Sequence, residues 1–364
     1  MRTSKRVICA ALAVITILMC SLVSCSETNS TLISFKDMKL STNVFLFLVS
    51  RYKTTYLQYA YQTMTGKTVA ISDLTDYPDF WAQQVGDTAA ETRGAGILQM
   101  TLYDQEAILY YAWYAKDKGI SLTSAEKASL KETLDSSITS VYKTKSAFEA
   151  ALKEFGMTYN LYLGYLELSK LSEKGKSSLY EAGGEAEIND AKILDYFKNN
   201  YYTTNRIKIN VKTDADGKEL SEEDAAKKTA LVDEIMKKME DGTLFEDLLE
   251  YDETSPDTDK ASAYKDAHRT ESLSEIGASA YFDTVKSLGI GGIGKAEIGS
   301  NIFIIKRYAL DEAKVTDYTS TIKGMLMTKD FATRYSALSQ LFVVDKSVFD
   351  LLNVSNIPLN KMFG

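Results

Sequence analysis

Residues 206–212 read Arg-Ile-Lys-Ile-Asn-Val-Lys, and this stretch decides the fold class. Ile207, Ile209 and Val211 alternate with polar residues, which is the pattern of a strand with one buried face. Residues 302–305, Ile-Phe-Ile-Ile, predict a second, buried strand. Helical patterns lie between these strands and on both sides of them. We therefore expect an α+β chain in which a strand-helix-helix-strand unit interrupts a mostly helical domain.

Helical spacing of apolar residues covers most of the chain before residue 206. A strong helix is predicted from Ile97 to Lys118, ended by Gly119, and Thr123 with Glu126 forms a capping box for the next one. Later helices are predicted to begin at Asn189 and Ser221, which are typical N-cap residues. Helical spacing returns from Asp317 to Leu352, and residues 289–294 are glycine-rich.

The first 25 residues predict a lipoprotein signal peptide. Arg2, Lys5 and Arg6 precede an uncharged apolar run over residues 7–23, which is short for a spanning helix of about 20 residues. Residues 22–25, Leu-Val-Ser-Cys, resemble the lipobox in which the cysteine of bacterial lipoproteins receives its lipid. The alternative is an ordinary secretory signal in which Cys25 is incidental.

Composition excludes several classes of function. The net charge is −8, and loss of the three basic residues with the signal makes it −11. An acidic chain repels phosphate backbones, so nucleic acid is not an expected partner. The chain has one histidine, and Cys9 and Cys20 leave with the signal, so we expect no metal site, no cofactor and no disulfide.

Residues 40 to about 345 resemble the parvulin-type foldase lipoproteins and periplasmic chaperones of the PrsA and SurA type. The resemblance rests on ordered segments: the helices at 97–122, 148–171 and 188–202, and then the strand, helix, helix and strand at 207–211, 231–249, 281–288 and 302–306. It implies the following divisions: a signal peptide, 1–24; a lipid-anchored tether, 25–39; a helical chaperone domain, 40–202; a degenerate parvulin-like domain, 203–312; and a C-terminal helical segment packing back on the helical domain, 313–364.

The resemblance also implies peptidyl-prolyl isomerisation or chaperoning of secreted proteins, but both family histidines are replaced. Lys208 stands at the first position and Phe303 at the second, so we expect weak or absent isomerase activity and assign no catalytic residue. Tyr281, Phe282 and Phe303 are candidates for the lining of a peptide groove, with Lys208 and Asp252 as polar candidates. The plainer readings are a core position for Phe303, a solvent-facing Lys208 and a solvated acidic loop at Asp252.

Several functions compete. The expected function is a membrane-anchored foldase or chaperone, and the alternatives are a non-catalytic holdase and a structural surface lipoprotein. A solute-binding lipoprotein ranks last, because the chain lacks repeated βαβ units. The expected partners are unfolded or newly secreted polypeptides. We also expect lipid on Cys25 to anchor the chain to the outer face of a bacterial cell membrane, and the resemblance suggests a Gram-positive host. The oligomeric state and the clients stay open.

Overall fold

The computed structural model describes residues 30–85, 91–214, 217–253, 268–272 and 279–362. The predicted signal peptide and Cys25 lie outside these residues. The chain forms two compact units, Met1–Glu187 with Lys329–Gly364 (unit 1) and Ile188–Thr328 (unit 2). Among the described residues, no helix is both long and apolar enough to cross a membrane.

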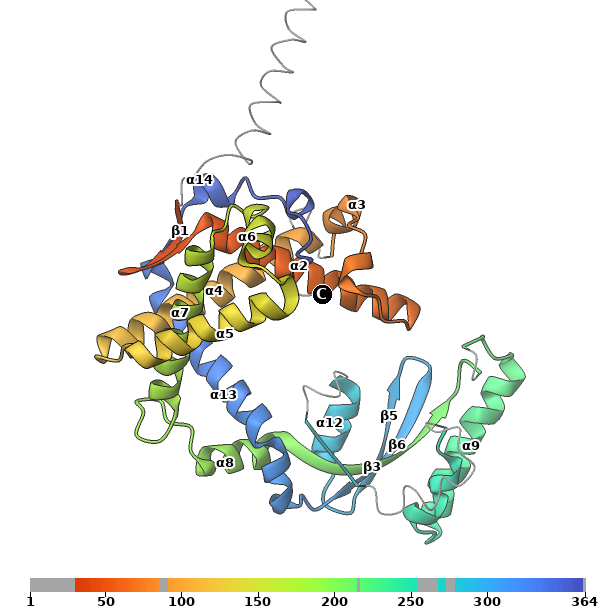
Figure 1. Ribbon diagram of the computed structural model, residues 1–364. Helices are drawn as coiled ribbons and strands as arrows, with labels where there is room; N and C mark the ends of the chain where they lie inside the picture. The colour runs from red at the N-terminus through yellow and green to blue at the C-terminus, as the bar shows by residue number, and fades with distance from the viewer. Residues whose placement is uncertain (1–29, 86–90, 215–216, 254–267, 273–278, 363–364) are drawn as a thin grey trace, which may run out of the picture. The chain divides into compact units, whose positions relative to one another are not determined.

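Unit 1 combines a helical core with a small antiparallel sheet (Figure 1). Its strands have the order β2-β1-β7, and its long helices α4 and α7 make its most extensive helix pair. Its elements before unit 2 are β1 (Thr31–Phe35), β2 (Met38–Ser41), α2 (Thr42–Thr65), η1 (Ile71–Asp73), α3 (Pro78–Ala82), α4 (Arg93–Asp117), α5 (Ser124–Tyr142), α6 (Lys145–Lys153) and α7 (Tyr159–Tyr180).

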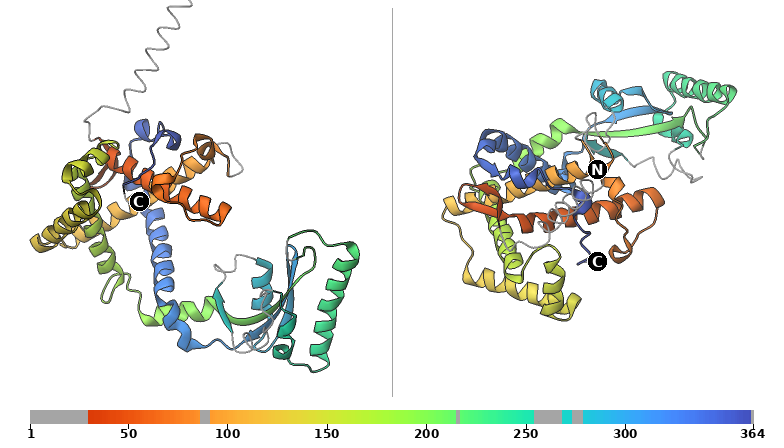
Figure 2. Two further views of the ribbon diagram at one scale, coloured as in Figure 1. Left: turned by 45° about the vertical axis from the view of Figure 1, so that its right-hand side comes forward. Right: turned by 90° about the horizontal axis from the view of Figure 1, so that it is seen from above.

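The polypeptide returns to unit 1 within α13 (Val315–Leu338), and the residues after α13 pack on the other elements of unit 1. Figures 1 and 2 show the blue C-terminal chain returning to β1 and running past α2 towards α3. After α13 come η4 (Ser339–Leu341), β7 (Phe342–Val344), α14 (Lys346–Phe349) and η5 (Val354–Asn356). The helical pattern predicted to Leu352 therefore ends at Leu338, because residues 342–344 pair with β1 instead of continuing the helix.

The predicted tether at residues 25–39 is too long. Leu32, Ile33 and Phe35 are buried in β1, where Phe35 packs against Trp113 of α4 and Phe342 of β7. A tether must stay solvated, whereas burying such side chains stabilises a fold by about 1.5–3 kcal/mol each. The folded domain therefore already includes Thr31, at the start of β1.

A glycine permits the close packing of α4 and α7. A Cβ atom built on Gly175 of α7 would lie 2.0 Å from the carbonyl oxygen of Tyr111 in α4. The same helix pair buries a hydroxyl contact of 3.1 Å between Tyr111 and Tyr180, and Tyr180 also donates to the carboxylate of Asp330 at 2.9 Å. The tyrosines of this region therefore belong to the core of unit 1.

Unit 2 is built on a four-stranded antiparallel sheet with the order β4-β3-β6-β5. Its elements are α8 (Asp190–Asn200), β3 (Tyr201–Asn210), α9 (Glu222–Glu240), η2 (Phe245–Tyr251), β4 (Arg269–Ser272), α12 (Ser279–Ser287), β5 (Ile293–Ile298), β6 (Asn301–Tyr308), η3 (Glu312–Lys314) and the first part of α13. Figure 1 shows α9 and α12 on opposite sides of this sheet.

The predicted domain limits and the two compact units differ. The sequence suggests divisions after residues 202 and 312, whereas the units divide after Glu187 and Thr328. The division after 202 lies inside β3, whose Tyr201 packs against Phe197 of α8 and Tyr318 of α13. These aromatic contacts attach both flanking helices to unit 2.

The local end signals of the helices are confirmed. Thr123 and Glu126 form the capping box of α5, and the side chains of Asn189 and Ser221 cap α8 and α9. Gly119, predicted to end a helix, takes a positive φ of 72° just after α4. These features depend on neighbouring residues alone, which is why the sequence suffices to find them.

Candidate functional site

The sheet of unit 2 has one apolar face and one mixed face. On the apolar face, Ile207, Ile209 and Ile304 pack with Val232 and Ile235 of α9 and with the apolar residues of η2. Because side chains alternate along a strand, the intervening residues of β3 and β6 point to the other face. That second face is covered by α12, which packs on β5 and β6, and we call it the α12 face.

Lys208 and Phe303 lie side by side on the α12 face. They are directly paired residues of β3 and β6, and directly paired residues point to the same side of a sheet. Phe303 is half-buried, and its ring meets the ring of Tyr281 edge-on, with 5.7 Å between centroids. The two positions predicted from the resemblance are therefore neighbours in space.

Tyr281 and Phe282 are both packed, although they are adjacent on α12 and point in different directions. Each is only 1 % exposed. Tyr281 faces Phe303, whereas the ring of Phe282 meets Tyr202 of β3 edge-on at 5.4 Å. Burial, together with the nearby charge of Glu271, raises the pKa of Tyr281, so this hydroxyl stays a neutral donor at neutral pH.

Arg206 gives the α12 face a fixed cation. Its guanidinium lies 5.7 Å from the ring centroid of Tyr281 and 5.5 Å from that of Phe303, within the range of cation–π attraction. It forms an ion pair of 3.6 Å with Glu271 of β4. Its Nε is buried and has no hydrogen-bond partner among the described residues. The guanidinium therefore keeps unused donor capacity beside two aromatic rings.

Thr204 contacts both Glu271 and Tyr281, two residues that lie beside the guanidinium of Arg206. Its hydroxyl donates to Glu271 Oε2 at 3.2 Å and lies 3.3 Å from the hydroxyl of Tyr281. Thr204, Arg206 and Lys208 are alternate residues of β3, so they form one row on the α12 face. The row thus holds two cations, while the hydroxyl of Thr204 is buried and already donates to Glu271.

Asp252 is not in a solvated loop. It is 2 % exposed, and its Oδ1 accepts a hydrogen bond of 2.8 Å from the backbone N–H of Lys208. The backbone N–H of Glu253 in turn donates to the carbonyl oxygen of Lys208 at 2.9 Å. These bonds satisfy the backbone N–H and C=O groups of Lys208, at the edge of β3 that β4 does not reach. Asp252 therefore fixes the backbone of the strand that carries Lys208.

The single histidine lies away from this constellation. The ring of His268 stacks on Tyr308 with 3.9 Å between centroids. The hydroxyl of Tyr308 donates to Glu246 of η2, on the side of the sheet opposite α12. Within the ranges that the structure describes, no group of three His, Cys, Asp or Glu residues is arranged to hold a metal ion. On the α12 face, Arg206, Lys208 and Phe303 are part-buried, whereas Thr204 and Tyr281 are enclosed.

Comparison with known proteins gives structural neighbours only. No protein-family model and no curated protein matches the sequence. The peptidylprolyl isomerase PrsA of Bacillus cereus is 16 % identical, and the match covers 78 % of this chain and 98 % of that one with a TM-score of 0.36. The foldase PrsA of Streptococcus pneumoniae is 16 % identical over 64 % of this chain and 77 % of that one, with a TM-score of 0.25.

A third neighbour comes from a study of PEB4 and Cj1289, two SurA-like chaperones of Campylobacter jejuni. It is 11 % identical, and the match covers 87 % of this chain and 98 % of that one with a TM-score of 0.26. The chain is similar in structure to PrsA foldases and SurA-like chaperones.

Sequence reasoning missed Arg206, Glu271 and Thr204. Arg206 and Thr204 are polar residues of a strand whose apolar alternation was evident, so that pattern places them on the face away from Ile207. Nothing in the sequence places Glu271, because β4 (Arg269–Ser272) has no apolar residue to mark it as a strand. The pairing of Thr204 with Arg269 and of Tyr202 with Glu271 places both β4 residues beside this row.

Proposed function

We propose that this protein is an extracytoplasmic chaperone that holds unfolded or newly secreted polypeptides, anchored to the outer face of the membrane by lipid on Cys25, with weak or no prolyl isomerase activity. The observation that carries the proposal is the pair of cations Arg206 and Lys208 beside Phe303, three part-buried residues of the α12 face. Backbone carbonyl groups occur in every polypeptide, and the two cations offer donors to them. The aromatic ring next to the donors offers contact surface for apolar or prolyl side chains.

The low isomerase activity follows from the residue types. Rotation about a peptide bond has a barrier of about 18–20 kcal/mol, which an isomerase lowers by holding the bond in a twisted geometry. The resemblance implies two imidazoles for this purpose, and Lys208 and Phe303 stand in their places. A lysine ammonium donates but does not accept, and a phenyl ring does neither. Binding survives these replacements better than catalysis does.

The first experiment measures both activities on the chain from Ser26 onward. A refolding protein limited by prolyl isomerisation reports catalysis, because the uncatalysed step takes tens to hundreds of seconds. Light scattering of an aggregating client reports holding. We expect suppressed aggregation at near-stoichiometric protein and no change in the refolding rate. Faster refolding at substoichiometric protein would instead restore the isomerase assignment, and no effect in either assay would leave the structural surface lipoprotein.

Variants of the α12 face localise the activity. Lys208→Glu reverses a charge in the proposed row, and we expect it to weaken the suppression of aggregation. Lys295→Glu is the matched control, because Lys295 of β5 lies 3.8 Å from Asp233 of α9, on the opposite side of the sheet. The double substitution Lys208→His with Phe303→His should raise the refolding rate, while Lys295→His should not. Equal losses for Lys208→Glu and Lys295→Glu would contradict a site on the α12 face.

A further inference from the structure

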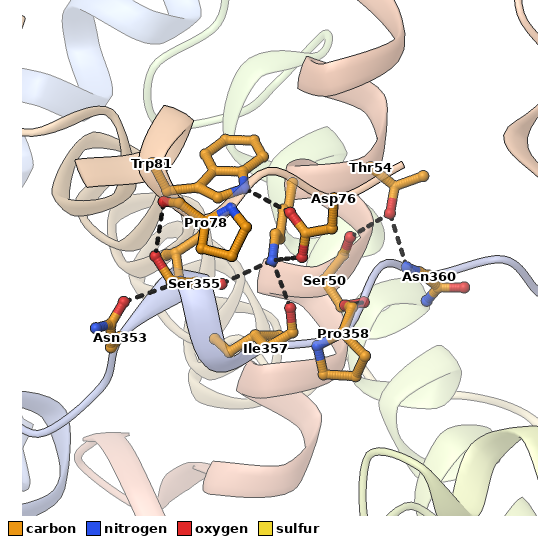
Figure 3. A network of polar contacts seen from close by, with 12 residues as sticks. Ser50, Thr54, Asp76, Pro78, Trp81, Asn353, Ser355, Ile357, Pro358 and Asn360 are labelled. Atoms are coloured by element: carbon orange, nitrogen blue, oxygen red, sulfur yellow. Dashed lines mark hydrogen bonds and ion pairs between the residues drawn. The ribbon is translucent and has the colours of Figure 1, made fainter. Parts of the chain in front are cut away.

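Most of the hydrogen bonds between the segment from Asn353 to Met362 and the rest of unit 1 involve the backbone of the segment, whose residues 354–356 form η5. Lys53 Nζ donates to the carbonyl oxygens of Val354 at 2.8 Å and Ile357 at 2.6 Å. Ser50 Oγ donates to the carbonyl oxygen of Pro358 at 2.6 Å. Figure 3 shows Ser50 and Thr54 of α2 directed at Pro358 and Asn360 of this segment.

Two more contacts also involve main-chain atoms of the segment. The backbone N–H of Asn360 donates to Thr54 Oγ1 at 2.7 Å, and the hydroxyl of Tyr142, at the end of α5, donates to the carbonyl oxygen of Met362. Every polypeptide carries these main-chain groups. Side chains of the segment add two contacts, because Ser355 Oγ donates to the carbonyl oxygen of Pro78 at 3.1 Å and Lys361 Nζ donates to that of Ser72 at 2.9 Å.

Lys53, at the centre of these contacts, is a buried cation whose desolvation opposes folding. Lys53 has a fully buried side chain, and its ammonium pairs with the carboxylate of Asp76. Asp76 is oriented by a hydrogen bond of 2.8 Å from Trp81 Nε1. Desolvation of a buried ion costs several kcal/mol, and replacement of a whole buried ion pair by apolar residues of similar volume often leaves stability unchanged or higher. Burial lowers the pKa of Lys53, partly offset by Asp76. The ammonium's other two contacts are both backbone carbonyl groups of the segment.

The side chains of the segment contribute apolar contact. Val354, Ile357, Leu359 and Met362 are all buried. The fit near Val354 is close, because a Cβ atom built on Gly94 of α4 would lie 3.3 Å from Val354 Cβ. The surface under the segment thus accepts apolar side chains while α2 binds the backbone between them.

The chain just before the segment is exposed. Leu351 is 84 % exposed, and the neighbouring residues 350 and 353 are exposed as well. An exposed connection followed by a segment bound largely through its backbone is the arrangement of a ligand tethered to its own site. The tether gives the segment a high effective concentration, so it occupies the site whenever no competitor is present.

We propose that the surface of unit 1 formed by α2, α3, α4 and the end of α5 is a binding site for short polypeptide segments with apolar side chains, and that residues 353–362 occupy it as an internal competitor. The identity of the displacing ligand as an unfolded client rests on the proposed function. The occupied site itself rests only on the contacts above.

The test cuts the connection in the full chain from Ser26 onward. A protease recognition sequence inserted after Leu351 allows cleavage of the folded protein, and a fluorescent peptide of sequence Asn353–Gly364 then probes the site. We expect saturable binding by anisotropy to the cut protein and none to the uncut protein. An unrelated peptide with apolar residues at the same spacing should displace the probe, and the same peptide with serine at those positions should compete at least tenfold more weakly.

Three outcomes would overturn the proposal. They are loss of the circular dichroism spectrum of the folded protein on cutting, absence of probe exchange within a day, and displacement of the probe by its own sequence alone. Lys53→Met in the cut protein should weaken all apolar peptides by a similar factor of at least ten, because the lost contacts are to backbone. Lys116→Met, at an exposed ion pair with Asp37, is the matched control and should change nothing. If the cut protein binds these peptides but clients still aggregate, the site stands and the chaperone function fails.

Discussion

Replacing Gly175 by alanine should strongly destabilise unit 1. The new Cβ would meet the carbonyl oxygen of Tyr111 at 2.0 Å, its carbonyl carbon at 2.9 Å and the backbone nitrogen of Ala115 at 3.1 Å. Because these are backbone atoms of α4, no side-chain rotation relieves the contact. Restoring an ordinary separation of about 3.5 Å requires α7 to move away from α4 by about 1.5 Å.

The expected cost follows from the size of that displacement. Overpacking a core costs about 1–3 kcal/mol, and a rigid backbone obstacle places this substitution at the upper end, near 3 kcal/mol. Gly164→Ala is the matched control, because Gly164 lies in the same helix and an added Cβ there meets nothing within 4 Å. That control should gain about 0.5–1 kcal/mol through the higher helix propensity of alanine.

Tryptophan fluorescence during urea unfolding isolates the effect. The chain has two tryptophans, Trp81 and Trp113, and both lie in unit 1. The signal therefore follows the unit that contains the substitution, even where unit 2 unfolds separately. A loss of less than about 1 kcal/mol for Gly175→Ala relative to the unchanged protein would refute the close approach of α4 and α7.

Three further substitutions probe the core of unit 1. Lys53→Met should cost about 3 kcal/mol by leaving Asp76 without its cation, and adding Asp76→Asn should recover part of the loss; equal stability of single and double variants in urea unfolding would argue against the pair. Burial raises the pKa of Glu106 in the folded protein above its value in the unfolded chain. The protonated carboxyl therefore stabilises the fold fully below the unfolded pKa, and this stabilisation is lost as the pH rises through the folded pKa. Glu106→Gln, which still accepts from Tyr335, should therefore raise the melting temperature at pH 7 and less at pH 4, and equal gains at both pH values would contradict this. Phe35→Ala should lower the free energy of unfolding by about 3–5 kcal/mol and shift the fluorescence emission of Trp113, against which Phe35 packs. An unchanged emission spectrum would show that β1 does not pack against α4.

The parts of the fold that were predictable from sequence are those with a local or periodic signature. The alternation at Ile207, Ile209 and Val211 marks β3, and the capping residues mark the starts of α5, α8 and α9. Among the described residues, five strands were missed: β4 is wholly polar, β5 contains Gly294, β7 has three residues, and the short strands β1 and β2 fall in or beside the predicted tether. The existence of β7 depends on a partner far away in the sequence, since it pairs with β1.

The site shows the same distinction. The resemblance singles out Lys208 and Phe303, and the structure pairs them on neighbouring strands. The positions of Arg206 and Glu271 beside Tyr281 require the register of three strands and the placement of α12, which no local pattern contains. Asp252 looks like part of an acidic loop in the sequence, and only the free edge of β3 explains why its carboxylate is buried.

The path of the chain through unit 1 also sets the order in which that unit can assemble. Ribosomes release the N-terminal part first, so β1, β2 and α2 are complete long before residues 342–362 have been synthesised. Until then, the edge of β1 lacks β7 and Lys53 lacks the two carbonyl groups that share its ammonium. Unit 2, which is contiguous in the sequence, can finish folding during this interval. Unit 1, in contrast, cannot be completed before residues 342–362 have emerged, and until then it resembles the unfinished chains that we propose the protein protects.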